Sequence, residues 1–157
     1  MAALIPCFMV ATQAEELAEY SCSVFPNSGI SRISRHPEGS DQAGQVLTVE
    51  FQLSGKPFTA LNGMDAGFSM GLTFYITCQD QAEVDHYWEA FLDGGEEGQC
   101  GWIKDRFGVW WQVAPARMAE FFSSEDRAAA GRAMAAMMTM RKIDLAIIEA
   151  AFADEEQ

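Results

Sequence analysis

The sequence predicts an α+β fold made of two copies of a β-α-β-β-β unit, which form a curved mixed sheet around a cavity, followed by C-terminal helices. Three observations predict it. Short segments of alternating apolar residues are interspersed with amphipathic helical segments. The spacing of the first strand and helix recurs once along the chain. The part of the chain after Arg117 is rich in alanine and methionine and has no strand pattern.

The first unit begins with a strand over about 5–10, which suits burial on both faces. Residues 12–15 have the T-x-x-E spacing of a capping box, which predicts a helix that ends at the Pro26 turn. Three strands are expected after it, at about 30–36, 45–53 and 57–62, with Ser54-Gly55 as a hairpin signal. In the 45–53 strand, Glu50 lies on the face opposite Val49 and Phe51.

The pattern then restarts with one constant offset. Phe74 follows Cys7 by 74 − 7 = 67 residues, and Val84 follows Leu17 by 84 − 17 = 67 residues. Residues 80–83 form a second capping signature, and strands are expected at about 99–104 and 109–114 around the turn 105–108, with a weak one near 96–99. One offset for both strand and helix predicts a tandem duplication.

The last part of the chain is expected to be helical, with Ser123 capping a helix from 124 to about 140 and a continuation over 142–152. The whole chain is predicted to be one domain over 1–157. Its parts are module one at about 4–63, module two at about 70–115 and a C-terminal helical extension over 116–157.

Charge excludes several functions. The chain has 10 Lys+Arg and 23 Asp+Glu, so 10 − 23 gives −13, which disfavours nucleic acid and anionic membranes as partners. No apolar stretch approaches the roughly 20 residues of a membrane-spanning helix, and the N-terminus lacks the basic region of a signal peptide. The cysteines form no CxxC pair, so reduced thiols and a cytoplasmic location are expected. The acids gather in helix starts, loops and the end at 154–156, as a solubilising outer shell.

Two long runs carry a family resemblance. They are VLTVEFQLSGKPFTALNG at 46–63 and GGEEGQCGWIKDRFGVWWQVAP at 94–115, supported by the opening IPCFMVATQAEELAEYSCSVFPNSGI. Together they resemble the PhnB-like branch of the vicinal oxygen chelate superfamily, which includes glyoxalase I, bleomycin-resistance proteins and extradiol dioxygenases. The resemblance implies paired modules around a shared cavity, and a homodimer. Members are often labelled demethylubiquinone methyltransferases, but no glycine-rich turn for a methyl donor follows a strand here.

The resemblance also locates the positions where metal-dependent members carry His and Glu ligands. In this chain they fall at or beside Cys7, at Met70 or Gly71, and at Gln112. None supplies the expected ligand, so no metal and no cofactor are predicted. His36 and His86 are expected at the surface, without a second donor at ligand spacing.

The predicted cavity has six lining residues: Cys7, Glu50, Asn62, Phe74, Trp110 and Gln112. Strand parity puts Trp110 beside Gln112 and puts Trp111 against the helices. Glu50 is the candidate general base, unless it bonds a neighbouring strand or an arginine. Cys7 is expected to be an inert core thiol.

Three functions follow as hypotheses. The first is a metal-independent protein that binds an apolar or aromatic small molecule. The second is an enzyme of the same superfamily that uses Glu50 as a general base, or a metal held by ligands not yet located. The third is an interaction module in which the cavity has closed.

Overall fold

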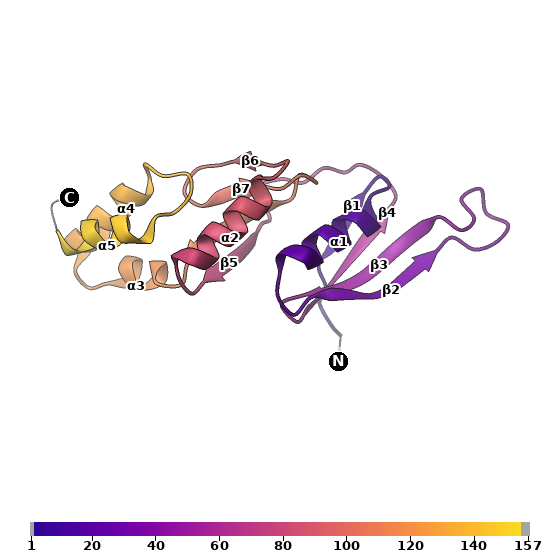
Figure 1. The fold of residues 1–157 in the computed structure, drawn as a ribbon, viewed down its shortest axis with the longest axis horizontal. Coiled ribbons are helices and arrows are strands. Elements are labelled where there is room, and N and C mark those ends of the chain that lie inside the picture. The colour runs from indigo at the N-terminus through magenta and orange to yellow at the C-terminus, as the bar shows by residue number, and fades with distance from the viewer. Residues whose placement is uncertain (1, 155–157) are drawn as a thin grey trace. The chain divides into compact units, whose positions relative to one another are not determined.

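The computed structural model describes residues 2–154 of the protein. The chain divides into two compact units, one ending at Gly67 and the other beginning at Phe68 (Figure 1). Each unit contains one four-stranded mixed sheet, which confirms the α+β class and the duplicated modules. The single domain over 1–157 and the cavity shared by the modules stay predictions. Residues 155 and 156 of the predicted acidic end lie outside the described part.

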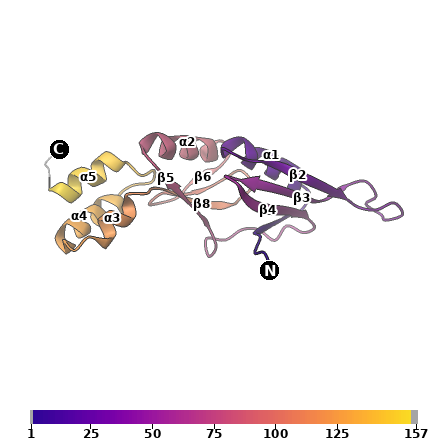
Figure 2. The ribbon, with the colours of Figure 1, turned by 90° about the horizontal axis from the view of Figure 1, so that it is seen from below.

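The first unit has the predicted β-α-β-β-β order: β1 (Cys7–Val10), α1 (Ala14–Val24), β2 (Gly29–Arg35), β3 (Val46–Leu53) and β4 (Lys56–Asn62). The strands lie side by side in the order β1-β4-β3-β2, with β1 parallel to β4 and the other pairs antiparallel. Helix α1 packs on one face of this sheet (Figures 1 and 2). The other face of the sheet therefore carries the alternate side chains of every strand.

Aromatic stacking fills the space between α1 and its sheet. The rings of Phe8 and Phe51 each lie 5.8 Å from the ring of Phe58, measured between centroids. Leu17 and Val49 are almost fully buried beside them. Burial of Phe8 and exposure of Cys7 show that β1 is buried on one face, so the predicted burial of both faces is wrong.

The capping box at Thr12 is also wrong. Helix α1 begins at Ala14, after an N-cap residue, Gln13, whose side chain makes no capping hydrogen bond. Asn62, at the end of β4, takes that role, because its Oδ1 accepts the Ala14 N–H at 2.8 Å. Its Nδ2 donates to the Val46 carbonyl at 3.0 Å, so one amide joins the helix start to two strands.

The second unit repeats the order with shorter strands: β5 (Phe74–Cys78), α2 (Gln81–Leu92), β6 (Glu96–Glu97), β7 (Trp102–Lys104) and β8 (Trp110–Pro115). Its sheet order, β5-β8-β7-β6, matches that of the first sheet. The predicted capping signature at Asp80 is confirmed, because Asp80 accepts the Glu83 N–H at 3.0 Å and Glu83 accepts the Gln79 N–H at 2.8 Å.

The offset of 67 holds for the helices and fails by one residue for the strands. Leu17 and Val84 are both buried, as the helical offset requires. In the strands, the buried Val10 corresponds to the buried Cys78, and 78 − 10 = 68. The turn after β1 has three residues, 11–13, whereas the turn after β5 has two, 79–80. One residue decides the face of every strand side chain, so Phe74 and Cys7 face opposite sides of their sheets.

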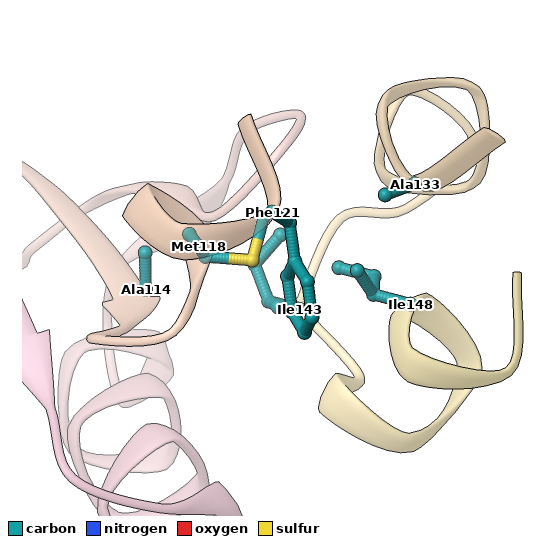
Figure 3. Packing of buried hydrophobic residues seen from close by; sticks show 6 residues of the cluster. All are labelled: Ala114, Met118, Phe121, Ala133, Ile143 and Ile148. Atoms are coloured by element: carbon teal, nitrogen blue, oxygen red, sulfur yellow. The ribbon is translucent and has the colours of Figure 1, made fainter. Parts of the chain in front are cut away.

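Three helices follow β8: α3 (Met118–Ser123), α4 (Arg127–Met137) and α5 (Leu145–Ala153). The predicted helix from 124 to about 140 corresponds to α4, and the predicted continuation over 142–152 corresponds to α5, whereas α3 was not predicted. The expected cap at Ser123 is wrong, because Asp126 caps α4 by accepting the Ala129 N–H at 2.9 Å. Side chains from α3, the segment before α5, and α5 meet in one apolar cluster, in which Phe121, Ile143 and Ile148 point toward one another (Figure 3).

This helical extension is tied to the second sheet through main-chain contacts. Gly101 donates its N–H to the Arg141 carbonyl at 2.7 Å, and Cys100 donates to the Met140 carbonyl at 2.9 Å. A Cβ on Gly101 would lie 2.6 Å from the Val113 carbonyl oxygen, and its φ is +82°, so only glycine fits there. The Gln81 side chain of α2 adds two more bonds, to the Ile143 carbonyl and the Leu145 N–H.

Candidate functional site

The face of the first sheet away from α1 carries a transverse row of polar side chains. Strand register places Cys7 beside Thr59, Thr59 beside Glu50, and Glu50 beside Arg32, one from each of the four strands. Two of the predicted site residues, Cys7 and Glu50, thus belong to one row of one face. Thr59 separates them, so they are two strands apart, roughly 9.6 Å between backbones.

Glu50 is paired rather than isolated. Its Oε1 lies 3.6 Å from the Arg32 guanidinium, and the two side chains are 45% and 69% exposed. An ion pair this exposed contributes little to stability. The alternative that Glu50 pairs with an arginine is therefore what the structure shows. Burial raises the pKa of the Cys7 thiol, so this partly exposed cysteine is not an activated thiolate.

The face of the second sheet away from α2 carries an amide among aromatic rings. Gln112 of β8 lies beside Tyr75 of β5 on one side and beside Trp102 of β7 on the other. Trp110 precedes Gln112 by two residues on the same strand and so projects from the same face. We call these four residues the aromatic face. Tyr75 is 55% exposed, and desolvation raises the pKa of its hydroxyl.

Trp111 lies on the other side, as parity predicts. It is 2% exposed, its ring stacks on that of Phe91 at 4.9 Å, and its indole N–H donates to Asp105 at 2.9 Å. In contrast, within residues 2–154 the rings of Tyr75, Trp102 and Trp110 stack on no other aromatic ring. The second sheet therefore buries Trp111 of β8 in the core and leaves Trp110 half-buried on the opposite face.

Two of the predicted cavity residues lie on the helix-facing sides instead. Phe74 pairs in register with Trp111, and their ring centroids are 5.3 Å apart, so it does not share a face with Trp110 and Gln112. The physical reason is the one-residue difference between the two strand-to-helix turns. Asn62 pairs in register with Val10 and is engaged at both ends of its amide by Ala14 and Val46.

Asp105, the buried carboxylate of the second unit, was not predicted from the sequence. It is 3% exposed and accepts three N–H groups, from Phe107, Val109 and the Trp111 indole, at 2.9–3.0 Å. Desolvation raises its pKa, although the three donors oppose that effect. The sequence does contain a signal for this turn, because Asp105 and Gly108 stand at its first and fourth positions, where a type I turn favours aspartate and glycine.

The histidines lie apart from both faces. His86 is exposed on α2, and its ring contacts Tyr87 edge-on. His36, expected at the surface, is half-buried and lines a pocket of about 430 Å³ near the start of α1. Other residues around this pocket include Thr12, Gln45 and Asn62.

Comparison with known proteins identifies the family. A sequence profile described as 3-demethylubiquinone-9 3-methyltransferase matches residues 2–114. The chain belongs to this family. It is similar to the structure of a putative 3-demethylubiquinone-9 3-methyltransferase, PhnB protein, from Bacillus cereus, with 26% identity and a TM-score of 0.66, over 73% of this chain and 100% of that chain. No curated protein matches it.

Two further solved structures are similar to this chain in fold only. A protein from Pseudomonas aeruginosa has 15% identity and a TM-score of 0.62, over 73% of this chain and 98% of that chain. The fosfomycin resistance protein FosX from Listeria monocytogenes, complexed with Mn(II) and sulfate, has 16% identity and a TM-score of 0.52, over 70% and 88%. The chain is thus a PhnB-like member of the vicinal oxygen chelate superfamily. No helix within residues 2–154 is long and apolar enough to cross a membrane.

The residues of this family member do not fit a divalent metal ion. In the described part of the chain, no three His, Cys, Asp or Glu side chains gather as a metal site requires. Cys7 has no histidine or acid beside it in register, since its neighbour on β4 is Thr59. Gln112 is bonded to Thr73, and Met70 and Gly71 lie in a turn before β5 rather than on a strand.

Proposed function

We propose that this protein binds a flat apolar or aromatic small molecule without a metal ion, on the vicinal oxygen chelate scaffold. The observation that carries the proposal is the aromatic face of Tyr75, Trp102, Trp110 and Gln112. These rings lie on the sheet side that α2 leaves uncovered, and within residues 2–154 they stack on no other ring. Aromatic side chains that no other ring covers, together with one convergent amide, are typical of sites for flat ligands.

The side chains nearest to this face favour a neutral ligand. Lys104 lies beside Trp110 in register, with its ammonium 5.4 Å from the indole centroid. The same ammonium pairs with Glu96, so its charge is already compensated. A net charge of −13 further disfavours an anionic ligand.

Metal independence rests on the donor set. A divalent ion needs hard or borderline donors in an open site. At the three positions that the resemblance assigns to metal ligands, this chain has Cys7, Met70 or Gly71, and Gln112, and none of them is an acid or a histidine. The recognition of ligand is therefore assigned to stacking and hydrogen bonding rather than to coordination.

Ligand binding can be tested by NMR on protein treated with a chelator. Neutral fused-ring aromatics should shift the indole N–H resonances of Trp102 and Trp110 and leave those of the buried Trp88 and Trp111 unchanged. Trp110→Leu should weaken binding about tenfold, since a stacked ring contributes about 0.5–1.5 kcal/mol beyond its buried area. Leu72→Ala, which changes an exposed apolar residue outside the aromatic face, is the matched control.

Two results would contradict the proposal. If no neutral aromatic shifts these resonances, the aromatic face is not a binding site. If the purified protein holds a stoichiometric divalent ion whose removal abolishes binding, metal independence is wrong. Adding Mn²⁺ to the chelator-treated protein should leave its melting temperature unchanged.

A second candidate function is enzymatic, with Glu50 as general base. The observation in its favour is the row that places Glu50 and Cys7 on one open face of the first sheet. The Arg32 ion pair favours the alternative, in which Glu50 only pairs with an arginine. Once a reaction is found, Glu50→Gln separates the two, because a general base contributes about 10²–10⁴-fold to the rate, and an unchanged rate excludes it.

Methyl transfer is not proposed, although it is the family's description. The strand-to-helix turns of the described chain are Ala11-Thr12-Gln13, Gln79-Asp80 and Ala116-Arg117, and none contains the glycines with which a methyl donor is usually held. A homodimer, a cytoplasmic location and the closed-cavity interaction module remain proposals. Light scattering on the purified protein tests the first, and ligand binding to the aromatic face would exclude the third.

A further inference from the structure

We propose that Gln112 makes the aromatic face selective for flat aromatics that carry a hydrogen-bond donor on the ring edge, such as a ring N–H. This inference rests on the proposed function and adds to it the chemistry by which the ligand is chosen. It follows from the disagreement between this chain and a metal site. At the position that the superfamily resemblance assigns to a metal ligand, this protein has an amide.

The register of the second sheet encloses that amide on three sides. Tyr75 and Trp102 are its partners on the neighbouring strands, each roughly 4.8 Å away between backbones. Trp110 lies two residues earlier on β8, roughly 6.7 Å along the strand. A flat molecule stacked on any of these rings therefore brings its edge within reach of the Gln112 side chain.

The amide has one end occupied and one end free. Its Nε2 donates to the Thr73 hydroxyl oxygen at 2.7 Å. Within residues 2–154 no donor reaches Oε1, and the Gln112 side chain makes no other polar contact. An amide oxygen has two lone pairs, so the free group that faces a ligand is an acceptor. A half-buried acceptor among aromatic rings favours a ligand that supplies the missing donor.

Thr73 keeps the amide in this orientation. It precedes β5 by one residue and shares the parity of Tyr75, so its hydroxyl lies on the same face as Gln112. The bond from Nε2 fixes the amide plane before any ligand arrives. The acceptor is therefore preorganised, and binding does not have to immobilise it.

Indole and 1-methylindole test the inference, because apolar burial and hydrogen bonding predict opposite orders of affinity for the two compounds. The N-methyl group adds apolar area and removes the only donor. If apolar burial alone governed binding, 1-methylindole would bind about fourfold tighter. We expect the reverse, with indole about fivefold tighter in calorimetric titration of the full chain, because only indole can donate to Oε1.

Substitution at position 112 assigns the preference to this amide. Gln112→Met keeps the volume and removes the acceptor, so it should bind the two compounds in the order set by apolar area. Gln112→Glu retains acceptor oxygens and should keep the preference for indole. Gln79→Met, at an exposed glutamine in the turn before α2, is the matched control and should behave as wild type. The Trp111 indole resonance reports that each variant is folded.

The outcomes separate this inference from the proposed function. If neither compound binds, the selection by Gln112 is overturned, and the proposed function is overturned with it only if the other neutral fused-ring aromatics also leave the Trp102 and Trp110 resonances unshifted. If both bind to wild type and 1-methylindole binds equally or more tightly, the proposed function stands and the selection by Gln112 is wrong. A preference for indole that survives Gln112→Met also overturns the inference, since the acceptor would then lie elsewhere.

Discussion

Replacing Asp105 by alanine should destabilise the second unit strongly. The carboxylate accepts N–H groups from Phe107, Val109 and the Trp111 indole, and it is almost fully buried. Hydrogen bonds to a charged group contribute about 1.5–3 kcal/mol each, and buried donors left unpaired cost about 1–3 kcal/mol. Relief of the buried charge offsets part of this, which leaves a loss of about 3–5 kcal/mol in the free energy of unfolding.

Urea denaturation, followed by circular dichroism and tryptophan fluorescence, measures this loss. Asp93→Ala is the matched control, because it also removes an aspartate bonded to a neighbouring side chain, Arg106, but one that is 81% exposed. It should cost less than about 1 kcal/mol. An Asp105→Ala variant that loses less than about 1 kcal/mol and keeps the Trp111 indole resonance in place would refute this account of the turn.

The contribution of Asp105 to the free energy of unfolding should also depend on pH. Burial raises its folded-state pKa above the ordinary carboxyl value. An acid with a raised folded-state pKa favours the folded state most below its unfolded-state pKa, and this contribution is lost as the pH rises through the folded-state pKa. Asp105→Asn does not titrate, so the stability of wild type relative to this variant should fall as the pH rises from about 3.

Three further predictions concern other contacts. Asn62→Ala should cost about 2 kcal/mol in urea denaturation, because it removes the N-terminal cap of α1 and the bond to β3; an unchanged midpoint would contradict this. The hydrogen bond from Lys142 lowers the pKa of Asp85. Protection of the first turn of α2 from hydrogen exchange should therefore fall as the pH drops through that pKa. Asp85→Asn should abolish this pH dependence. Burial raises the pKa of Cys78 to about 12, so iodoacetamide should modify Cys78 about tenfold more slowly than Cys7. Mass spectrometry measures both rates, and equal rates would contradict the burial of Cys78.

The sequence by itself determined the modules and their order, because strand alternation and helical spacing are local patterns. Glu50 opposite Val49 and Phe51, and Trp110 opposite Trp111, follow from parity within a single strand. The capping signature at Asp80 was correct for the same reason, since all its partners lie within four residues.

The tertiary structure decided what depends on contacts between distant residues. Asn62 caps a helix 48 residues earlier, which displaces the expected cap at Thr12. A turn shorter by one residue puts Phe74 against Trp111 rather than beside Gln112, and no periodicity within a strand reports the length of the turn that follows it. The burial of Asp105 and the free oxygen of Gln112 likewise appear only when neighbouring strands are paired, because a side chain's hydrogen-bond partners are set by the sheet and not by its own strand.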